Sequence, residues 1–131
     1  VAAALLYPDK HILSICGDAG FLMNVQEMET AKRLGCNMTV MVWEDHEYGL
    51  IAWKQTNEFG RHTDLSFNNP DWMQLASAFG WHGHLIEQTE ALESTIRQAL
   101  AEPGPSLIVV PIDYRENLKL TDEMGQIEFS L

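Results

Sequence analysis

Apolar residues occur along the chain in two patterns, short continuous runs and runs spaced by three or four residues. The continuous runs are rich in β-branched side chains and end at glycine, proline or acidic residues, which is typical of strands in a parallel sheet. The run Met38–Trp43 has no alternation, which indicates a strand that is covered on both faces. The predicted strands are His11–Cys16, Met38–Trp43, His84–Glu87 and Ser106–Ile112.

Helices are predicted between these strands. Val25, Met28, Ala31 and Leu34 recur every three residues, and Gly35 ends that helix. Val1–Leu6 is expected to be the end of a buried helix, and another helix is expected over Leu50–Phe59. Two more are expected to begin at residues suited to capping: Asn69 as N-cap before Pro70, and Thr89 before the apolar positions Leu92, Ile96, Ala99 and Leu100.

The order of these segments determines the fold class. Strands that are joined by helices run parallel, so the pattern predicts an α/β domain. We expect a doubly wound, mostly parallel sheet with helices on both faces over residues 1–114, followed by a C-terminal extension over residues 115–131. Ligands of such sheets collect at the carboxyl ends of the strands.

Charge and cysteine content narrow the function. The 131 residues include 8 basic and 19 acidic side chains, a formal net charge of −11, which disfavours nucleic acid and anionic membranes as partners. No apolar run approaches the roughly 20 residues that cross a bilayer. Cys16 and Cys36 lie in apolar or helical stretches, which indicates a reducing, cytoplasmic setting.

His82 and His84 alternate along a strand, and we expect a structural role for them because no third ligand is near in sequence.

The ends of the first two strands carry the candidate chemistry. We expect a tight loop over Gly17–Phe21 after the first strand. It contains Asp18, and the small residues Gly17, Ala19 and Gly20 let a phosphate approach the backbone. The second strand ends in the acidic loop Glu44–Gly49. Between Gly17 and Leu50 the sequence has six acidic residues and two basic ones, so a diphosphate would be repelled unless a cation bridged it. Carboxylates, carbonyls and phosphates are suitable ligands for Mg²⁺.

This arrangement resembles the thiamine diphosphate-binding motif, in which Gly-Asp-Gly and a later Asn-Asn pair flank about two dozen residues. Here Gly17-Asp18-Ala19 and Glu44-Asp45 flank 24 residues. The resemblance implies that the Asp18 and Asp45 side chains and the Glu47 backbone oxygen hold Mg²⁺. Two departures are the replacement of the second glycine by Ala19 and of the first asparagine by Glu44, which puts the bracing of the loop in question.

The wider sequence is similar to acetolactate synthases, in particular the catabolic, flavin-independent type. The resemblance is carried by GDAGFLMNVQEMETAKRLGCN, EYGLIAWKQ, NNPDWMQLASAFGWHG and PIDYRENLKLTDEMG. It implies that two pyruvates are condensed to 2-acetolactate with loss of CO₂, and that Tyr48, Gly49 and Leu50 line the cofactor. In that family the activating glutamate comes from another domain of a neighbouring subunit, so we expect this chain to be part of a larger homo-oligomeric enzyme, without a catalytic residue of its own and inactive alone.

Several alternatives remain open at this point. The same domain serves other thiamine enzymes, such as 2-oxo acid decarboxylases and pyruvate oxidases, whose substrate pockets are built largely by other parts. A receiver-like signalling module also places acids around Mg²⁺, although the expected lysine after the last strand is absent before Lys119. Asp18 alone could be a helix cap, and Glu44, Asp45 and Glu47 a merely solvated loop.

Overall fold

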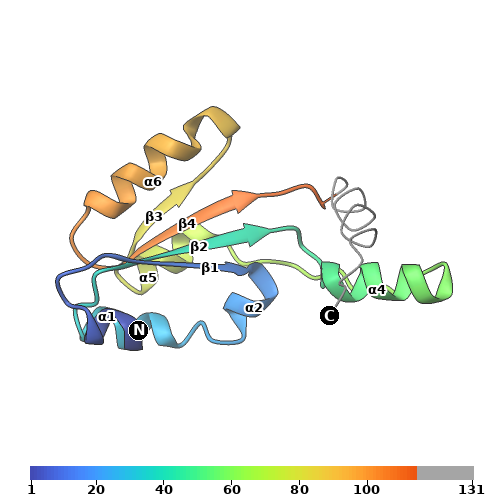
Figure 1. The fold of residues 1–131 in the computed structure, drawn as a ribbon, viewed down its shortest axis with the longest axis horizontal. Helices are drawn as coiled ribbons and strands as arrows, with labels where there is room; N and C mark the ends of the chain where they lie inside the picture. Colours follow the sequence, from blue (N-terminus) through green and yellow to red (C-terminus); the bar gives the residue numbers. More distant parts are fainter. Residues whose placement is uncertain (115–131) are drawn as a thin grey trace, which may run out of the picture.

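The computed structural model describes residues 1–114 as a four-stranded parallel sheet (Figure 1). The strands are β1 (Ile12–Gly17), β2 (Met38–Glu44), β3 (His82–Leu85) and β4 (Ser106–Pro111). Their order in the sheet is β1-β2-β4-β3, so β1 and β3 are the edges. All three neighbouring pairs are parallel, which confirms the predicted fold class. The predicted extension over residues 115–131 lies outside the described residues.

Helices cover both faces of the sheet. On one face, α1 (Ala2–Leu6), α2 (Asp18–Leu22), α3 (Glu27–Arg33) and α5 (Trp72–Ala78) pack against the larger core cluster. On the other face, a 3₁₀ turn η1 (Thr89–Ala91) leads into α6 (Leu92–Ala101), which packs on a smaller cluster. Helix α4 (Gly49–Phe59) extends beyond the carboxyl ends of β2 and β4 (Figure 1). The sheet is therefore doubly wound.

Six of the eight largest fully buried side chains of residues 1–114 belong to the central strands β2 and β4. Val42 of β2 and Leu107, Ile108 and Val109 of β4 have no exposed surface. Successive side chains of a strand point to opposite faces, so these residues supply both core clusters. The continuous apolar run Met38–Trp43 thus indicated the two-sided burial of β2 correctly.

The region after β1 differs from the prediction. Gly17–Phe21 was expected to be a loop, but the chain turns into α2 directly at Asp18. The helix predicted from Val25 to Leu34 is shorter, and α3 buries Met28 and Ala31. Leu34 is exposed, because the helix ends at Arg33 before this position.

Two predicted caps are also wrong. Helix α5 is capped by Asp71, whose carboxylate accepts the backbone N–H of Gln74 at 3.0 Å, and Asn69 lies further upstream. The Gln74 side-chain amide also donates to the Asp71 carboxylate at 2.8 Å, so the two residues have the spacing of a capping box, with a side-chain contact in place of the one to the N-cap backbone N–H. Thr89 makes no side-chain capping bond and begins η1 instead.

Strand β3 begins two residues before the predicted start at His84 and ends at Leu85. Gly83 lies within this strand, at a point where α5 passes close to the sheet. A Cβ on Gly83 would lie 3.1 Å from both the Ala76 Cβ and the Met73 sulfur. The absence of a side chain at Gly83 therefore permits close helix–sheet packing. Within residues 1–114, the structure contains no helix long and apolar enough to cross a bilayer.

Candidate functional site

The candidate site lies where β1 and β2 end. Gly17 pairs with Trp43 in the parallel register, so the residues that follow the two strands emerge side by side. The Asp18 Oδ2 atom accepts hydrogen bonds from the backbone N–H groups of Asp45, at 3.3 Å, and His46, at 3.0 Å. The structure thus brings together the two carboxylate-bearing loops that the sequence identified.

Asp18 is the most buried carboxylate of this site, with a side chain that is nearly inaccessible. The residue is 1% exposed, and its Oδ1 atom accepts the Ala19 N–H at 2.8 Å. Its Oδ2 atom also accepts the Asn69 side-chain amide at 2.7 Å. A simple helix cap satisfies N–H groups of its own helix. Asp18 instead joins α2 to two distant segments, and its less engaged oxygen is Oδ1.

Asp45 is more accessible than Asp18 and has few partners of its own. Its Oδ1 atom accepts the Glu47 N–H at 3.4 Å. Burial raises the pKa of the Asp45 carboxyl above its ordinary value, the Glu47 N–H opposes that rise, and the nearby carboxylates of Asp18 and Glu47 add to it. Removal from water and like charge both disfavour the ionised acid. A bound divalent cation would reverse this balance, so the paired acids fit a metal site.

Basic side chains of residues 1–114 do not neutralise this pair. In the described part of the chain, the ion pairs of arginine are Arg33–Glu29 and Arg97–Glu93, each within one helix. Among residues 1–114, Asp18 and Asp45 therefore have no lysine or arginine partner. The same range of residues contains no group of three His, Cys, Asp or Glu side chains placed to hold a metal. The predicted set does not require one, since its third ligand is the Glu47 backbone oxygen.

Glu44, which replaces the first asparagine of the usual motif, holds the acidic loop Glu44–Gly49 in place through its side chain. Its Oε1 atom accepts the Trp72 indole N–H at 2.5 Å and the Asn69 amide at 3.0 Å. The imidazole Nε2 of His46 lies 3.5 Å from the same oxygen. Glu44 thus connects the end of β2 to the beginning of α5, and it supplies the bracing that its replacement of asparagine had put in question.

A short antiparallel contact holds the rest of the acidic loop. Glu47 forms an isolated bridge with Ser66, flanked by hydrogen bonds from Tyr48 N–H to the Leu65 oxygen and from Phe67 N–H to the His46 oxygen. The Tyr48 and Phe67 rings lie 5.2 Å apart between centroids. The backbone that carries the predicted Glu47 ligand is therefore fixed on both sides.

Two of the predicted cofactor-lining glycines have room beside them. An added Cβ at Gly17 or Gly20 would have no atom of the described residues within 4 Å beyond the local backbone, so a ligand has room to approach both. At Gly49, the first residue of α4, a Cβ would lie 2.7 Å from Asp45 Oδ2. Tyr48 is 39% exposed and Leu50 is 69% exposed. The room beside the glycines is consistent with a bound diphosphate.

Three residues of the site were missed by sequence reasoning. Asn69 was predicted to be a helix cap and Trp72 was given no role at the site, yet both donate to Glu44. Tyr114 lies in the segment that follows β4. The Ile112 N–H attaches this segment to β2 by donating a hydrogen bond to the backbone oxygen of Glu44 at 3.0 Å. Burial raises the pKa of the Tyr114 hydroxyl, and the carboxylates of Asp45 and Asp18 raise it further. The capping-box spacing of Asp71 and Gln74 was the available signal that Asn69 was free for another role.

His82 and His84, for which we expect a structural role, both lie near Glu102. The His84 Nε2 atom lies 2.8 Å from a Glu102 carboxylate oxygen, and His82 Nδ1 lies 3.9 Å from the same oxygen. Both histidines are thus close to the segment that joins α6 to β4. They are remote in sequence from the carboxylates at the ends of β1 and β2.

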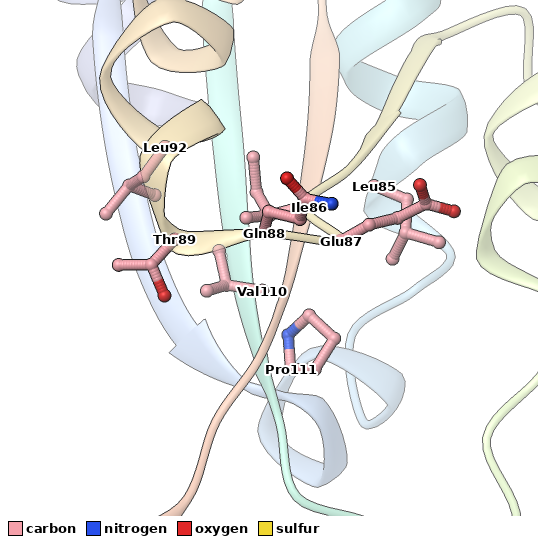
Figure 2. A pocket seen from close by; sticks show the side chains of 8 residues that line it. All are labelled: Leu85, Ile86, Glu87, Gln88, Thr89, Leu92, Val110 and Pro111. Carbon is pink, nitrogen blue, oxygen red and sulfur yellow. The ribbon is translucent and has the colours of Figure 1, made fainter.

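A separate apolar pocket of about 220 Å³ lies at the carboxyl ends of β3 and β4. Figure 2 shows it between the end of β4, with Val110 and Pro111, and the turn that leads into α6. Its lining also includes Leu85, Ile86, Glu87, Gln88, Thr89 and Leu92. None of the predicted site residues lines this pocket.

Comparison with known proteins identifies the family. Residues 1–110 match the family described as the C-terminal TPP-binding domain of thiamine pyrophosphate enzymes. The chain is 37% identical to the catabolic acetolactate synthase of Raoultella terrigena, over 99% of this chain and 23% of that protein. It is 34% identical to the acetolactate synthase of Bacillus subtilis, over 98% of this chain and 23% of that protein. It is also 34% identical to the acetolactate synthase isozyme 2 large subunit of Escherichia coli, over 90% of this chain and 22% of that protein.

The chain therefore spans about a quarter of the length of these relatives. The match to the family covers all four strands and the loops that carry Asp18 and Asp45. It confirms the predicted cofactor, because thiamine pyrophosphate is another name for thiamine diphosphate. The chain belongs to the thiamine pyrophosphate enzymes, as their C-terminal cofactor-binding domain.

Proposed function

We propose that this chain holds the diphosphate and Mg²⁺ of thiamine diphosphate in an acetolactate synthase, which condenses two pyruvates to 2-acetolactate and releases CO₂. The observation that carries the proposal is the joining of the two acidic strand ends through Asp18, in a domain of this family. The similarity to three acetolactate synthases supports this member of the family over others.

The residues have distinct roles in this proposal. Asp18, Asp45 and the backbone oxygen of Glu47 hold Mg²⁺, which offsets their charge and that of the diphosphate. Gly17, Ala19 and Gly20 let the diphosphate approach the backbone, and Tyr48, Gly49 and Leu50 line the cofactor. When bound, the cofactor supplies the carbanion that attacks the carbonyl of pyruvate. The protein supplies placement and electrostatic stabilisation.

We assign no catalytic residue to this chain. The activating glutamate is proposed to come from another domain of a neighbouring subunit, so the chain is inactive alone. Exposed apolar side chains on α4 support such a partner: Ile51 is 48% exposed and Phe59 is 70% exposed. The other domains or a second subunit of a cytoplasmic homo-oligomer would cover such side chains.

The test is product analysis on the full-length protein with pyruvate, thiamine diphosphate and Mg²⁺, and with EDTA as the control. We expect metal-dependent formation of 2-acetolactate and CO₂. Acetaldehyde as the main product would instead indicate a 2-oxo acid decarboxylase, and acetyl phosphate a pyruvate oxidase. Turnover that persists after complete removal of divalent cations would contradict the metal role of Asp18 and Asp45.

A further inference from the structure

We propose that Asn69 is a positioning residue for the metal-binding carboxylates, an inference that rests on the proposed function. Its side-chain nitrogen lies 2.7 Å from Asp18 Oδ2 and 3.0 Å from Glu44 Oε1. One amide group thus connects a predicted metal ligand to the carboxylate that braces the loop. These contacts link positions 51 and 25 residues apart in the chain.

The chemistry of the two neighbours determines how the amide is oriented. Ionised carboxylates accept hydrogen bonds only, so the Asn69 nitrogen, with its two N–H groups, must face them. The opposite orientation would place the amide oxygen against two carboxylates. Asn69 Oδ1 accordingly points elsewhere and is buried without a hydrogen-bond partner among the described residues.

The backbone on either side of Asn69 is held in place. Two residues earlier, the Phe67 N–H donates to the His46 oxygen at 2.9 Å, which attaches this segment to the acidic loop. Two residues later, Asp71 caps α5. The Asn69 side chain is therefore presented to Asp18 and Glu44 from a fixed position. Such support from packed neighbours is what a preorganised site requires.

The two carboxylates need this separation. Asp18 and Glu44 approach the same amide nitrogen, and neither forms an ion pair with lysine or arginine among residues 1–114. Without the amide, Asp18 would lose a charge-assisted hydrogen bond and face Glu44 directly. We infer that Asn69 fixes Asp18 Oδ2 and leaves Oδ1 available to the cation.

A double-mutant cycle on the full-length protein tests this role. Mn²⁺ affinity is measured in the presence of thiamine diphosphate, from the electron paramagnetic resonance signal of free Mn²⁺. We expect Asn69→Ala to weaken Mn²⁺ binding about tenfold. In the Glu44→Gln background, where the neighbouring charge is gone, we expect the same change to weaken binding less than about threefold. The matched control is Asn68→Ala, at the exposed adjacent asparagine, which should bind Mn²⁺ like the wild type.

The outcomes separate this inference from the proposed function. If the wild-type protein binds Mn²⁺ and thiamine diphosphate together, and Asn69→Ala binds Mn²⁺ equally well, the positioning role is wrong and the proposed function stands. An equal loss in both backgrounds would reduce Asn69 to a packing residue and also overturn the inference. If the wild type itself fails to bind Mn²⁺ with the cofactor, the proposed function and the inference both fall. Should Asn69→Ala fold poorly alone, restored folding in the Glu44→Gln background would support the same coupling, and its absence would contradict it.

Discussion

The two carboxyl-end regions of the sheet differ in chemistry although they share a place in the fold. At the ends of β1 and β2, Asp18, Glu44 and Asp45 lie within one hydrogen-bonded network. At the ends of β3 and β4, a pocket is lined mainly by apolar side chains, including Ile86 and Val110. The carboxyl edge of a parallel sheet therefore indicates where a ligand can bind, and the side chains decide which part of that edge is suited to it.

This difference in chemistry predicts that substitutions at the two ends of the sheet will affect different properties, cofactor binding at one end and stability at the other. Unneutralised carboxylates at the β1–β2 end cost free energy until a cation arrives, whereas the apolar β3–β4 end contributes burial whether or not a ligand is bound. Substitutions at the first end should change cofactor binding most. Substitutions at the second end should change stability alone.

The largest effect is expected from Asp18→Ala in the full-length protein. The change removes a predicted metal ligand and leaves the N–H groups of Ala19 and His46 and the Asn69 amide without their acceptor. We expect more than about a hundredfold loss of thiamine diphosphate affinity and a loss of stability of roughly 2 kcal/mol or more. Calorimetric titration and thermal unfolding measure the two quantities. Wild-type cofactor affinity in this variant would exclude Asp18 as a ligand.

Asp45 should separate binding from folding more cleanly. Its side chain makes one long hydrogen bond, to the Glu47 N–H, so Asp45→Ala should change stability by less than about 1 kcal/mol. Cofactor retention should nevertheless be lost, because the diphosphate would lack its metal bridge. Asp45→Asn keeps an oxygen ligand and should cost about tenfold in affinity. Equal affinities of the alanine and asparagine variants would show that the oxygen at this position is not a ligand.

Gly20→Ala should move stability and binding in opposite directions. Gly20 lies within α2, and its added methyl group would meet no atom of the described residues within 4 Å, apart from its chain neighbours and the helix backbone. Alanine should therefore stabilise the helix by up to about 1 kcal/mol. The same methyl group would occupy the space proposed for the diphosphate, and we expect several-fold weaker cofactor binding. If affinity is unchanged, the diphosphate lies elsewhere on this edge.

The smallest effect on the cofactor is expected from Leu92→Ala at the other end. Leu92 lines the apolar pocket and packs on the core beneath α6. Its truncation should destabilise this region by about 1–2 kcal/mol, because the side chain is only partly buried. Hydrogen exchange in β3 and β4 should accelerate, while cofactor affinity stays at the wild-type value. A clear loss of affinity would show that the two ends are coupled.

Sequence reasoning predicted the elements whose signals are local. Strands β2 and β4 follow from continuous apolar runs, and the pairing of Asp18 with Asp45 follows from the parallel strands that precede them. The role of Asn69 could not be predicted in this way. An asparagine before proline is a good helix cap, and only the tertiary structure shows that its amide lies beside Asp18.

Strand β3 was misplaced for a related reason. Gly83 lowers the strand signal of its segment, and its value appears only when Met73 and Ala76 of α5 pack against it. The bracing role of Glu44 likewise depends on Trp72, which is distant in sequence. Contacts of this kind arise from packing between elements, so the local pattern of residues does not encode their partners.

The most direct test of the account is the binding of thiamine diphosphate to the full-length protein, measured by calorimetry with Mg²⁺ and again after treatment with EDTA. The account predicts tight binding that requires the cation, and loss of that binding in Asp45→Ala with the fold intact. Binding of equal strength with and without divalent cations would contradict the central claim that the carboxylates at the ends of β1 and β2 hold the diphosphate through a metal ion.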